Sequence, residues 1–376
     1  MCVEAYFSSH YVLFDFLAFE PLFSTMPLQQ DIRFCTSSDG VKIATTSTGA
    51  GFPLVRAGTW LSHLDCDARH KEPQAYIRAL SKAFHYIRYD SRGSGLSDRK
   101  IPSPTFDDGV KDLEAVVAAH GLKKFALFGM SMGAATSIAY AARHPEQVSH
   151  LVILSGFATS VFSTPKVSQK AIDEAELVIK SAELGWNSPK SMFRKMFVAQ
   201  LLGNPTPEQQ QDLEERMQLS MTPEMAAAYL RNNYSIDVRA QCAQLMVPTL
   251  VFHCRKDEMI DFEQGRKLAA RIANSRFVPL AAQGHVLLST EAAMQVFEAE
   301  LTAFLGTGGP APKLSPRQTQ VLRAIATGST DKEAARALGL SPRTVEMHVA
   351  AALKALGTAT RAEAVHRAGG LGLLHE

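Results

Sequence analysis

Three residues, far apart in this chain, are of the types that together cleave acyl bonds by nucleophilic attack. Ser131 lies within the run Gly129-Met130-Ser131-Met132-Gly133, Asp257 follows an apolar run, and His285 comes last. A serine hydroxyl attacks a carbonyl efficiently when an imidazole takes its proton and a carboxylate orients that imidazole. We therefore expect Ser131, Asp257 and His285 to act as nucleophile, orienting acid and general base.

The residues around Ser131 predict a sharp turn between a strand and a helix. The apolar run Phe125–Phe128 precedes the turn, and Ala134–Arg143 has a helical pattern. Gly129 and Gly133 are needed because larger side chains there would strike the neighbouring strand and helix. The helix N-terminus under Ser131 also favours developing negative charge.

Backbone N–H groups are expected to bind the oxyanion that forms during such an attack. Met132 supplies one donor, and the loop after Val55 supplies a second from Thr59 or Trp60. Asp257 and His285 each come just past a predicted strand, at the sheet edge where α/β proteins gather their sites. Taken singly, each also has an ordinary interpretation as a surface residue; Glu258 and Asp261 are weaker candidates for the acid.

Strand and helix patterns alternate along the chain from Asp31. Such alternation predicts a mainly parallel sheet covered by helices on both faces. Strand patterns are absent between Phe157 and Val247, where the sequence is helical and Met-rich, so we expect residues 157–247 to form a cap over a pocket. The expected strands contain Ile32–Phe34, Val41–Ala44, Pro53–Val55, Tyr86–Tyr89, Phe125–Phe128, Leu151–Leu154, Thr249–Phe252 and Phe277–Pro279.

The chain divides into four parts on composition. Residues 1–30 are interpreted as an N-terminal extension, because their apolar run is interrupted by Asp15 and Glu20 and is too short to span a bilayer. Residues 31–305 form the alternating part. The Gly- and Pro-rich residues 306–313 are a short linker, and residues 314–376 form a small all-helical domain.

Helix-capping signals mark almost every boundary in residues 314–376. Ser315-Pro316, Thr330 with Glu333, Ser341-Pro342 and Thr360 with Glu363 each predict a helix start, and Gly339 predicts a tight turn. A helix, a short Gly turn and a second helix form the unit that places one helix in the major groove of DNA.

Charge and cysteine content agree with this division. From Lys313 onward there are nine Lys and Arg against five Asp and Glu, whereas the rest of the chain has 30 basic and 32 acidic residues. A mildly basic tail suits a polyanionic partner. The five cysteines are scattered, which predicts reduced thiols in the cytoplasm and no zinc site. We expect no metal and no cofactor.

Residues 31–305 resemble the α/β-hydrolase superfamily, through the Gly129–Gly133 motif, the order Ser, Asp, His and the loop Arg88–Ser97. The family often has His-Gly where this chain has Ala57-Gly58. The resemblance implies an α/β-hydrolase fold: a mainly parallel sheet with a helical cap. Asp90 and Arg92 are expected to brace their loop rather than to react.

Residues 314–376 resemble the LuxR-type helix-turn-helix domain of bacterial transcription regulators. The matching runs are Leu314–Arg317, Lys332–Ala335, Leu338–Ser341, Thr344-Val345, His348-Val349 and Leu353–Gly357. The resemblance implies that 342–356 is the recognition helix, with Val345, Val349, Leu353 and Leu356 in the core. The expected DNA-contact positions are Lys332, Arg343, Thr344, Glu346, Met347, His348, Ala350 and Lys354.

Glu346 and Ala350 occupy positions where the family usually has basic or polar residues. We therefore expect weak nonspecific binding, strong salt dependence and a need for two copies of the chain. The sequence predicts a transcription regulator that binds double-stranded DNA and whose hydrolase-like domain senses, or also hydrolyses, a small ester or lactone. The alternative is a serine esterase whose C-terminal module is vestigial or serves in docking. No membrane partner is expected.

Overall fold

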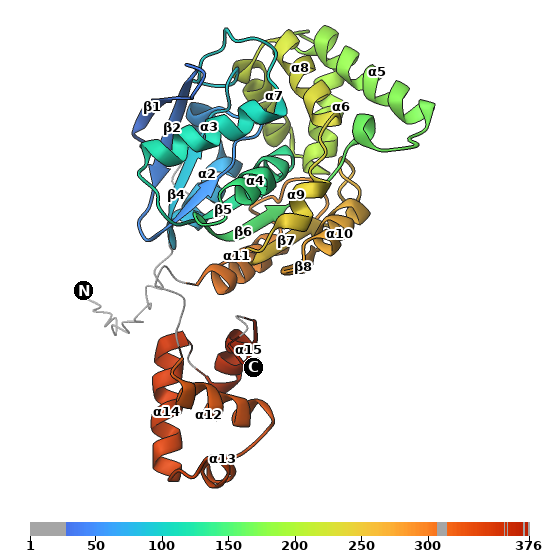
Figure 1. The fold of residues 1–376 in the computed structure, drawn as a ribbon. Helices are drawn as coiled ribbons and strands as arrows, with labels where there is room; N and C mark the ends of the chain where they lie inside the picture. Colours follow the sequence, from blue (N-terminus) through green and yellow to red (C-terminus); the bar gives the residue numbers. More distant parts are fainter. Residues whose placement is uncertain (1–27, 307–313, 357, 359, 371–372, 375–376) are drawn as a thin grey trace, which may run out of the picture.

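The computed structural model describes residues 28–306, 314–356, 358, 360–370 and 373–374 (Figure 1). Most of the expected N-terminal extension and nearly all of the expected linker lie outside these residues. Among the described residues, no helix combines the length and apolar character needed to cross a bilayer.

The larger part of the chain is built on an eight-stranded sheet with the strand order β1-β2-β4-β3-β5-β6-β7-β8. Only β2 is antiparallel to its neighbours β1 and β4; the other pairs are parallel. Every expected strand is confirmed. The strands are β1 Ile32–Thr36, β2 Lys42–Thr48, β3 Phe52–Arg56, β4 Phe84–Tyr89, β5 Phe125–Met130, β6 Val148–Leu154, β7 Thr249–Cys254 and β8 Ser275–Leu280.

Helices cover both faces of this sheet, and each face has its own apolar core. The strands read as unbroken apolar runs because both faces are buried: Phe125 and Leu127 of β5 belong to one core, and Ala126 and Phe128 to the other. The covering helices are α1 Leu64–Arg69, α2 Lys71–Ser81, α3 Phe106–Ala119, α4 Met132–Arg143, α9 Arg239–Gln244, α10 Phe262–Arg271 and α11 Ala292–Leu305.

Four further helices lie between β6 and β7 and cover one end of the sheet (Figure 1). We call α5–α8 the cap. It begins after a short 3-10 turn, η1 (Val161–Ser163), and α9 that follows it packs on α4 and α10 of the sheet domain. The cap helices are α5 Gln169–Gly185, α6 Met192–Leu202, α7 Pro207–Ser220 and α8 Pro223–Tyr234.

The C-terminal residues form a separate four-helix body, drawn in red in Figure 1. Its apolar side chains, including Val321, Val345, Val349 and Leu356, form cores of their own. The helices are α12 Pro316–Ala326, α13 Asp331–Leu338, α14 Pro342–Leu356 and α15 Arg361–Gly370.

The predicted caps explain where these four helices begin and end. Ser315 and Thr330 each take part in a full capping box, with Gln318 and Glu333. The turn between α13 and α14 uses Gly339, whose φ of 65° and ψ of 37° are left-handed values that glycine adopts at little cost. Helix α14 therefore starts from a fixed turn.

Candidate active site and nucleic-acid interface

Ser131 stands at the strand-to-helix turn between β5 and α4, as predicted. It is the N-cap of α4, with φ 53° and ψ −127°, a strained conformation for a residue with a side chain. A Cβ on Gly129 would lie 2.6 Å from Cα of Ala134, and one on Gly133 would lie 3.1 Å from the carbonyl oxygen of Ala57. The two glycines permit this close packing, which presents Ser131 at the sheet edge.

Asp257 and His285 are brought together by the loops after β7 and β8. Nδ1 of His285 lies 2.7 Å from Oδ2 of Asp257, and both side chains are buried. Oδ1 of Asp257 accepts the backbone N–H groups of Met259 and Ile260, both at 2.9 Å. Burial would raise the pKa of Asp257, but hydrogen bonds from His253 and His285 outweigh it and hold the pKa well below its usual range.

This arrangement leaves Nε2 of His285 available to accept a proton from a nucleophile. A carboxylate on Nδ1 fixes the imidazole so that Nε2 is the basic nitrogen. No hydrogen bond joins Ser131 to His285 in the described part of the chain; such bonds are commonly long in enzymes without substrate. Thus the structure pairs the predicted acid and base directly, and places Ser131 at the carboxyl end of β5.

The expected oxyanion donors are uncommitted backbone groups. Within the described residues, the N–H groups of Met132, Thr59 and Trp60 have no hydrogen-bond partner. Met132 begins α4, where the first N–H groups of a helix have no intrahelical acceptor. The Trp60 ring packs on Trp186, at 5.8 Å between centroids, and on Phe197, at 5.6 Å. The oxyanion loop is thereby attached to the cap.

The cap also contacts the loop that carries His285. The carbonyl oxygen of Leu201, near the end of α6, accepts the N–H groups of His285 at 2.9 Å and Val286 at 3.0 Å. The two backbones approach so closely that a Cβ on Gly284 would lie 2.5 Å from the carbonyl carbon of Leu202. The position of His285, the predicted general base, is therefore set partly by the cap.

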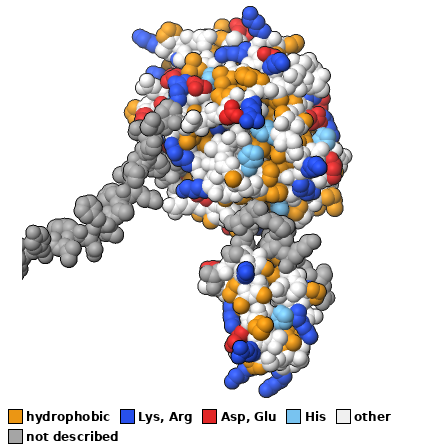
Figure 2. All heavy atoms as spheres, turned by 90° about the vertical axis from the view of Figure 1, so that its left-hand side faces the viewer, with side chains coloured by type: hydrophobic (Ala, Val, Ile, Leu, Met, Phe, Trp, Pro, Cys, Tyr) orange, Lys and Arg blue, Asp and Glu red, His pale blue; other side chains and the backbone are white. Residues whose placement is uncertain are grey.

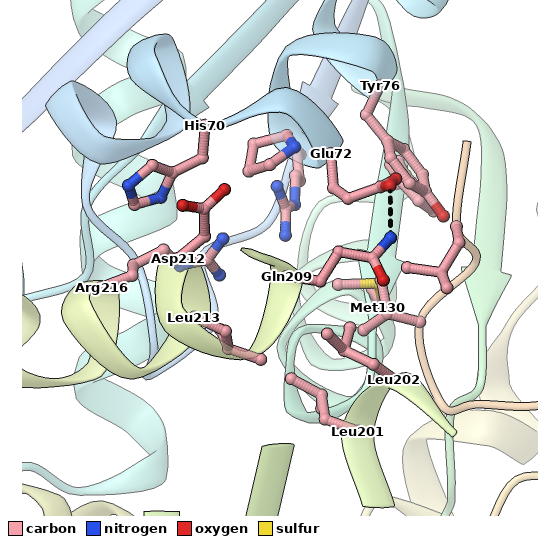
Figure 3. A pocket seen from close by; sticks show the side chains of 15 residues that line it. His70, Glu72, Tyr76, Met130, Leu201, Leu202, Gln209, Asp212, Leu213 and Arg216 are labelled. Atoms are coloured by element: carbon pink, nitrogen blue, oxygen red, sulfur yellow. Dashed lines mark hydrogen bonds between the residues drawn. The ribbon is translucent and has the colours of Figure 1, made fainter. Parts of the chain in front are cut away.

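A pocket opens between α2 of the sheet domain and α7 of the cap (Figure 3). Its apolar floor includes Met130 and Val286, the neighbours in sequence of Ser131 and His285. Polar groups lie around its rim, among them His70, Asp212 and Arg216 on one side and the hydrogen-bonded pair Glu72 and Gln209 on the other. Ser131, Asp257 and His285 do not themselves line this pocket, which approaches them only through Met130 and Val286.

Most of the predicted DNA-contact residues are exposed on the helical body. Thr344 and His348 are half-buried, and the hydroxyl of Thr344 is hydrogen-bonded to that of Ser341 at 2.8 Å. Met347 is 65% exposed. In Figure 2, Lys and Arg side chains gather at the lower end of this body, the level of α13 in Figure 1. The fully exposed positions are Lys332, Arg343, Glu346, Met347, Ala350 and Lys354.

Comparison with protein families identifies both domains. A family model described as the alpha/beta hydrolase fold matches residues 66–292, more than half of the chain. The chain belongs to the α/β-hydrolase family. A second model, for bacterial regulatory proteins of the luxR family, matches residues 312–368, so the C-terminal domain is a LuxR-type helix-turn-helix domain.

Similar proteins cover the α/β-hydrolase domain rather than the whole chain. The "AB hydrolase superfamily protein YisY" of Bacillus subtilis is 28% identical over 67% of this chain and 92% of its own length. A "putative carbamate hydrolase RutD" of Cronobacter turicensis is 26% identical, over 63% and 87%. The solved esterase EaEST of Exiguobacterium antarcticum superposes with a TM-score of 0.61, at 23% identity, over 72% of this chain and 98% of its own.

Two polar residues near these sites were not singled out from the sequence. In the α/β-hydrolase domain, buried His253 donates from Nε2 to the carbonyl oxygen of Ile260 at 2.9 Å and lies 3.4 Å from Oδ2 of Asp257. In the LuxR-type domain, Arg361 forms a salt bridge with Asp331, at 2.8 Å for one of its nitrogens. His253 is four residues before Asp257 at the end of β7, a spacing that suggests a second contact with the acid.

The described residues contain no cluster of side chains that could bind a metal ion. Within the residues described, no three His, Cys, Asp or Glu side chains lie together as a metal ion would require. The four cysteines described are free, and Cys66, Cys242 and Cys254 are buried.

Proposed function

We propose that this protein is a DNA-binding transcription regulator whose α/β-hydrolase domain, residues 31–305, binds a small ester- or lactone-like compound and hydrolyses it. One observation carries the proposal: a capped helix-turn-helix and a hydrogen-bonded acid and base occur in the same chain. The acid and base are Asp257 and His285, in loops that follow strands of the sheet. The linker of residues 306–313 would connect the two activities.

DNA recognition is assigned to α14. Its buried residues Val345 and Val349 hold the helix on the bundle while Arg343 and Met347 face solvent. Arginine reads guanine edges with two hydrogen bonds, whereas exposed lysines such as Lys332 and Lys354 reach phosphates. With Glu346 on the same surface, one copy makes few favourable contacts, so the active form on DNA is a dimer.

Hydrolysis is assigned to the triad. Ser131 attacks the carbonyl carbon and gives its proton to Nε2 of His285, while Asp257 stabilises the imidazolium that forms. The N–H groups of Met132 and of Thr59 or Trp60 bind the oxyanion. His285 then returns the proton to the leaving alcohol, and water releases the acyl group by the same steps in reverse. Relatives named as a hydrolase and an esterase support this reaction class.

The alternative is a serine hydrolase in which the LuxR-type domain serves only for docking. The low pKa of Asp257, held by two histidines, supports a working triad independently of any DNA binding. Against this alternative, the capping boxes of Ser315 and Thr330 and the buried core around Val345 are complete, and a domain without selection for folding would lose such features.

The substitution Ser131→Ala separates these functions. We expect the full chain to hydrolyse p-nitrophenyl butyrate, and Ser131→Ala to lose this activity while retaining DNA binding. Wild-type protein that hydrolyses no p-nitrophenyl or lactone substrate would remove the enzymatic half of the proposal.

Binding to DNA fragments upstream of the protein's own coding sequence tests the other half. Footprinting with the full chain at two salt concentrations should give a protected site that is lost in Arg343→Ala. The absence of any salt-sensitive footprint, with hydrolysis intact, would favour the docking alternative.

A further inference from the structure

Three arginines surround one carboxylate beneath the cap. Asp67 of α1 pairs with Arg88 of β4 at 3.3 Å and with Arg216 of α7 at 3.2 Å. Arg56, at the end of β3, lines the same cavity and pairs with no carboxylate of the described residues. Among these four side chains, three guanidinium groups therefore accompany one carboxylate, and Glu72 and Asp212 line the larger adjoining cavity.

Two hydrogen-bond donors of this arginine cluster also lack an acceptor. The Nε–H groups of Arg88 and Arg216 are buried and have no partner among the described residues. Such donors usually cost free energy unless an acceptor binds them. Elsewhere in the same domain the buried Arg92 pairs with Asp39, Asp108 and Asp112, so unpaired arginines are not a general property of this interior.

Arg56 remains charged in this setting. Burial would lower the pKa of its guanidinium, but Tyr86 and the Asp67 carboxylate outweigh burial and raise that pKa above its ordinary value. The Arg56 side chain is half-buried, and a guanidinium there that has no salt bridge to a carboxylate attracts an anion.

Arg56 and Arg216 line two adjoining cavities. The larger, between α2 and α7, has a volume of about 90 Å³, several times what one water molecule needs, and its lining includes Met130 and Val286, the sequence neighbours of Ser131 and His285. The smaller is lined by Thr59, an expected oxyanion donor. The arginines thus lie between an apolar pocket and the oxyanion loop, and Figure 3 places Arg216 at the rim of this pocket.

The acidic groups of the pocket have other partners. Glu72 accepts hydrogen bonds from the side chain of Gln209 and the backbone N–H of Ser289, both at 2.8 Å. Burial raises the pKa of Asp212, and the charge on nearby His70 acts to lower it. Neither carboxylate forms a salt bridge with Arg56 or Arg216.

We propose that the pocket between α2 and α7 is a binding site for a small organic carboxylate, whose charged end is held by Arg56 and Arg216 and whose apolar end lies on Met130 and Val286. The ligand carboxylate supplies acceptors to Arg56 and Arg216, with which Glu72 and Asp212 form no salt bridge. This inference rests on the proposed function in one respect: it assigns the sensed compound to acids, or to esters and lactones that carry a free carboxylate.

Binding to the full chain tests this site without any need for DNA or hydrolysis. The probe is sodium butanoate, with butanamide as a neutral compound of matched shape and inorganic phosphate as a second anion, all at equal ionic strength. Of the three compounds, we expect only butanoate to raise the midpoint of thermal unfolding, because a ligand that binds only the folded state stabilises that state. Isothermal titration should give the same order of affinities.

Variants assign the effect to the arginines. Arg56→Met should weaken butanoate binding at least tenfold, and Arg56→Lys, which keeps the charge but not the planar fork, should weaken it less. Arg78→Met, on α2 outside the pocket, is the matched control and should bind as the wild type does. If Arg56→Met does not fold, the comparison of Arg56→Lys with the control still decides.

The outcomes separate this site from the proposed function. Equal effects of butanoate and butanamide, or unchanged butanoate affinity in the Arg56 variants, would overturn the carboxylate site, and so would tight phosphate binding without butanoate binding. Ser131→Ala and Arg343→Ala should both retain butanoate binding. A failure of hydrolysis or of the footprint would therefore leave the result for this site standing.

Discussion

Leu201 and His285 are joined through their backbones: the carbonyl oxygen of Leu201 in the cap accepts the N–H group of His285 at 2.9 Å. The same oxygen accepts the N–H group of Val286. A rigid-body shift of the cap would carry His285 with it or break these two bonds. Because Leu201 also lines the pocket under the cap, direct contacts connect that pocket with the position of His285.

Gly284→Ala should disturb this link. The added Cβ would lie 2.5 Å from the carbonyl carbon of Leu202, so the loop carrying His285 must move away from α6. We expect ester hydrolysis to fall at least tenfold, measured as kcat/KM, with DNA affinity unchanged. Gly109→Ala is the control, because its Cβ would find only ordinary contact at 3.5 Å from Thr136. Wild-type activity in Gly284→Ala would mean that the contact does not position His285.

His253 should act as a positioning residue for Asp257. His253→Phe keeps an aromatic ring but removes the donor near Oδ2 of Asp257, and one hydrogen bond to a charged group contributes about 1.5–3 kcal/mol. We expect kcat to fall by about tenfold or more and the acid limb of the pH profile to move upward, with partial rescue in His253→Gln.

His150→Phe, a ring change away from the triad, should behave as the wild type. A loss of folding stability in His253→Phe with an unchanged pH profile would assign His253 a purely structural role.

Asp90 should make stability depend on pH. Burial raises its pKa to about 7, although the N–H groups of Leu96 and Leu64 favour the charged form. Its pKa is higher folded than unfolded, so the folded state binds the proton more tightly. The contribution of Asp90 to the free energy of unfolding therefore falls as the pH rises from about 4 to about 7, and it stays constant at higher pH.

Denaturant unfolding of the wild type and Asp90→Asn between pH 5 and 8 measures this effect. The free energy of unfolding of the wild type should fall by on the order of a few kcal/mol between pH 5 and 8, and that of Asp90→Asn should fall by less. Parallel curves for the two proteins would show that Asp90 is ionised throughout.

Glu346→Gln should strengthen binding to nonspecific DNA. The carboxylate of Glu346 is exposed on α14, and its negative charge repels the phosphate backbone. The same charge contributes to raising the pKa of Arg361. We expect higher affinity at low salt and a steeper dependence of log affinity on log salt, by up to about one unit. Fluorescence anisotropy of the full chain on random duplex DNA measures both. Glu298→Gln, in the α/β-hydrolase domain, should change neither.

The sheet, the turn at Ser131 and the four C-terminal helices were predictable because local residue patterns specify them. Apolar runs buried on both faces, glycines at 129 and 133 and capping boxes at Ser315 and Thr330 all act over a few residues. The pairing of Asp257 with His285 was also predictable, because the two residues follow neighbouring strands, β7 and β8.

The arginine cluster was not predictable from such patterns. Arg56, Arg88 and Arg216 come from two strands and a cap helix, and only the packing of the cap on the sheet domain brings them to one carboxylate. The contact of Leu201 with His285 is likewise made by backbone atoms, which leave no residue-type signal apart from the glycines at 203 and 284.

The backbone of Ser131 has a consequence for how this chain can change. At φ 53° and ψ −127° every side chain is strained, and glycine alone relieves the strain, by roughly 1–3 kcal/mol. Replacing Ser131, the proposed nucleophile, by glycine would therefore favour the folded state. The proposed hydrolysis is thus the property that such chains would lose most easily, because a single substitution removes it and also stabilises the protein.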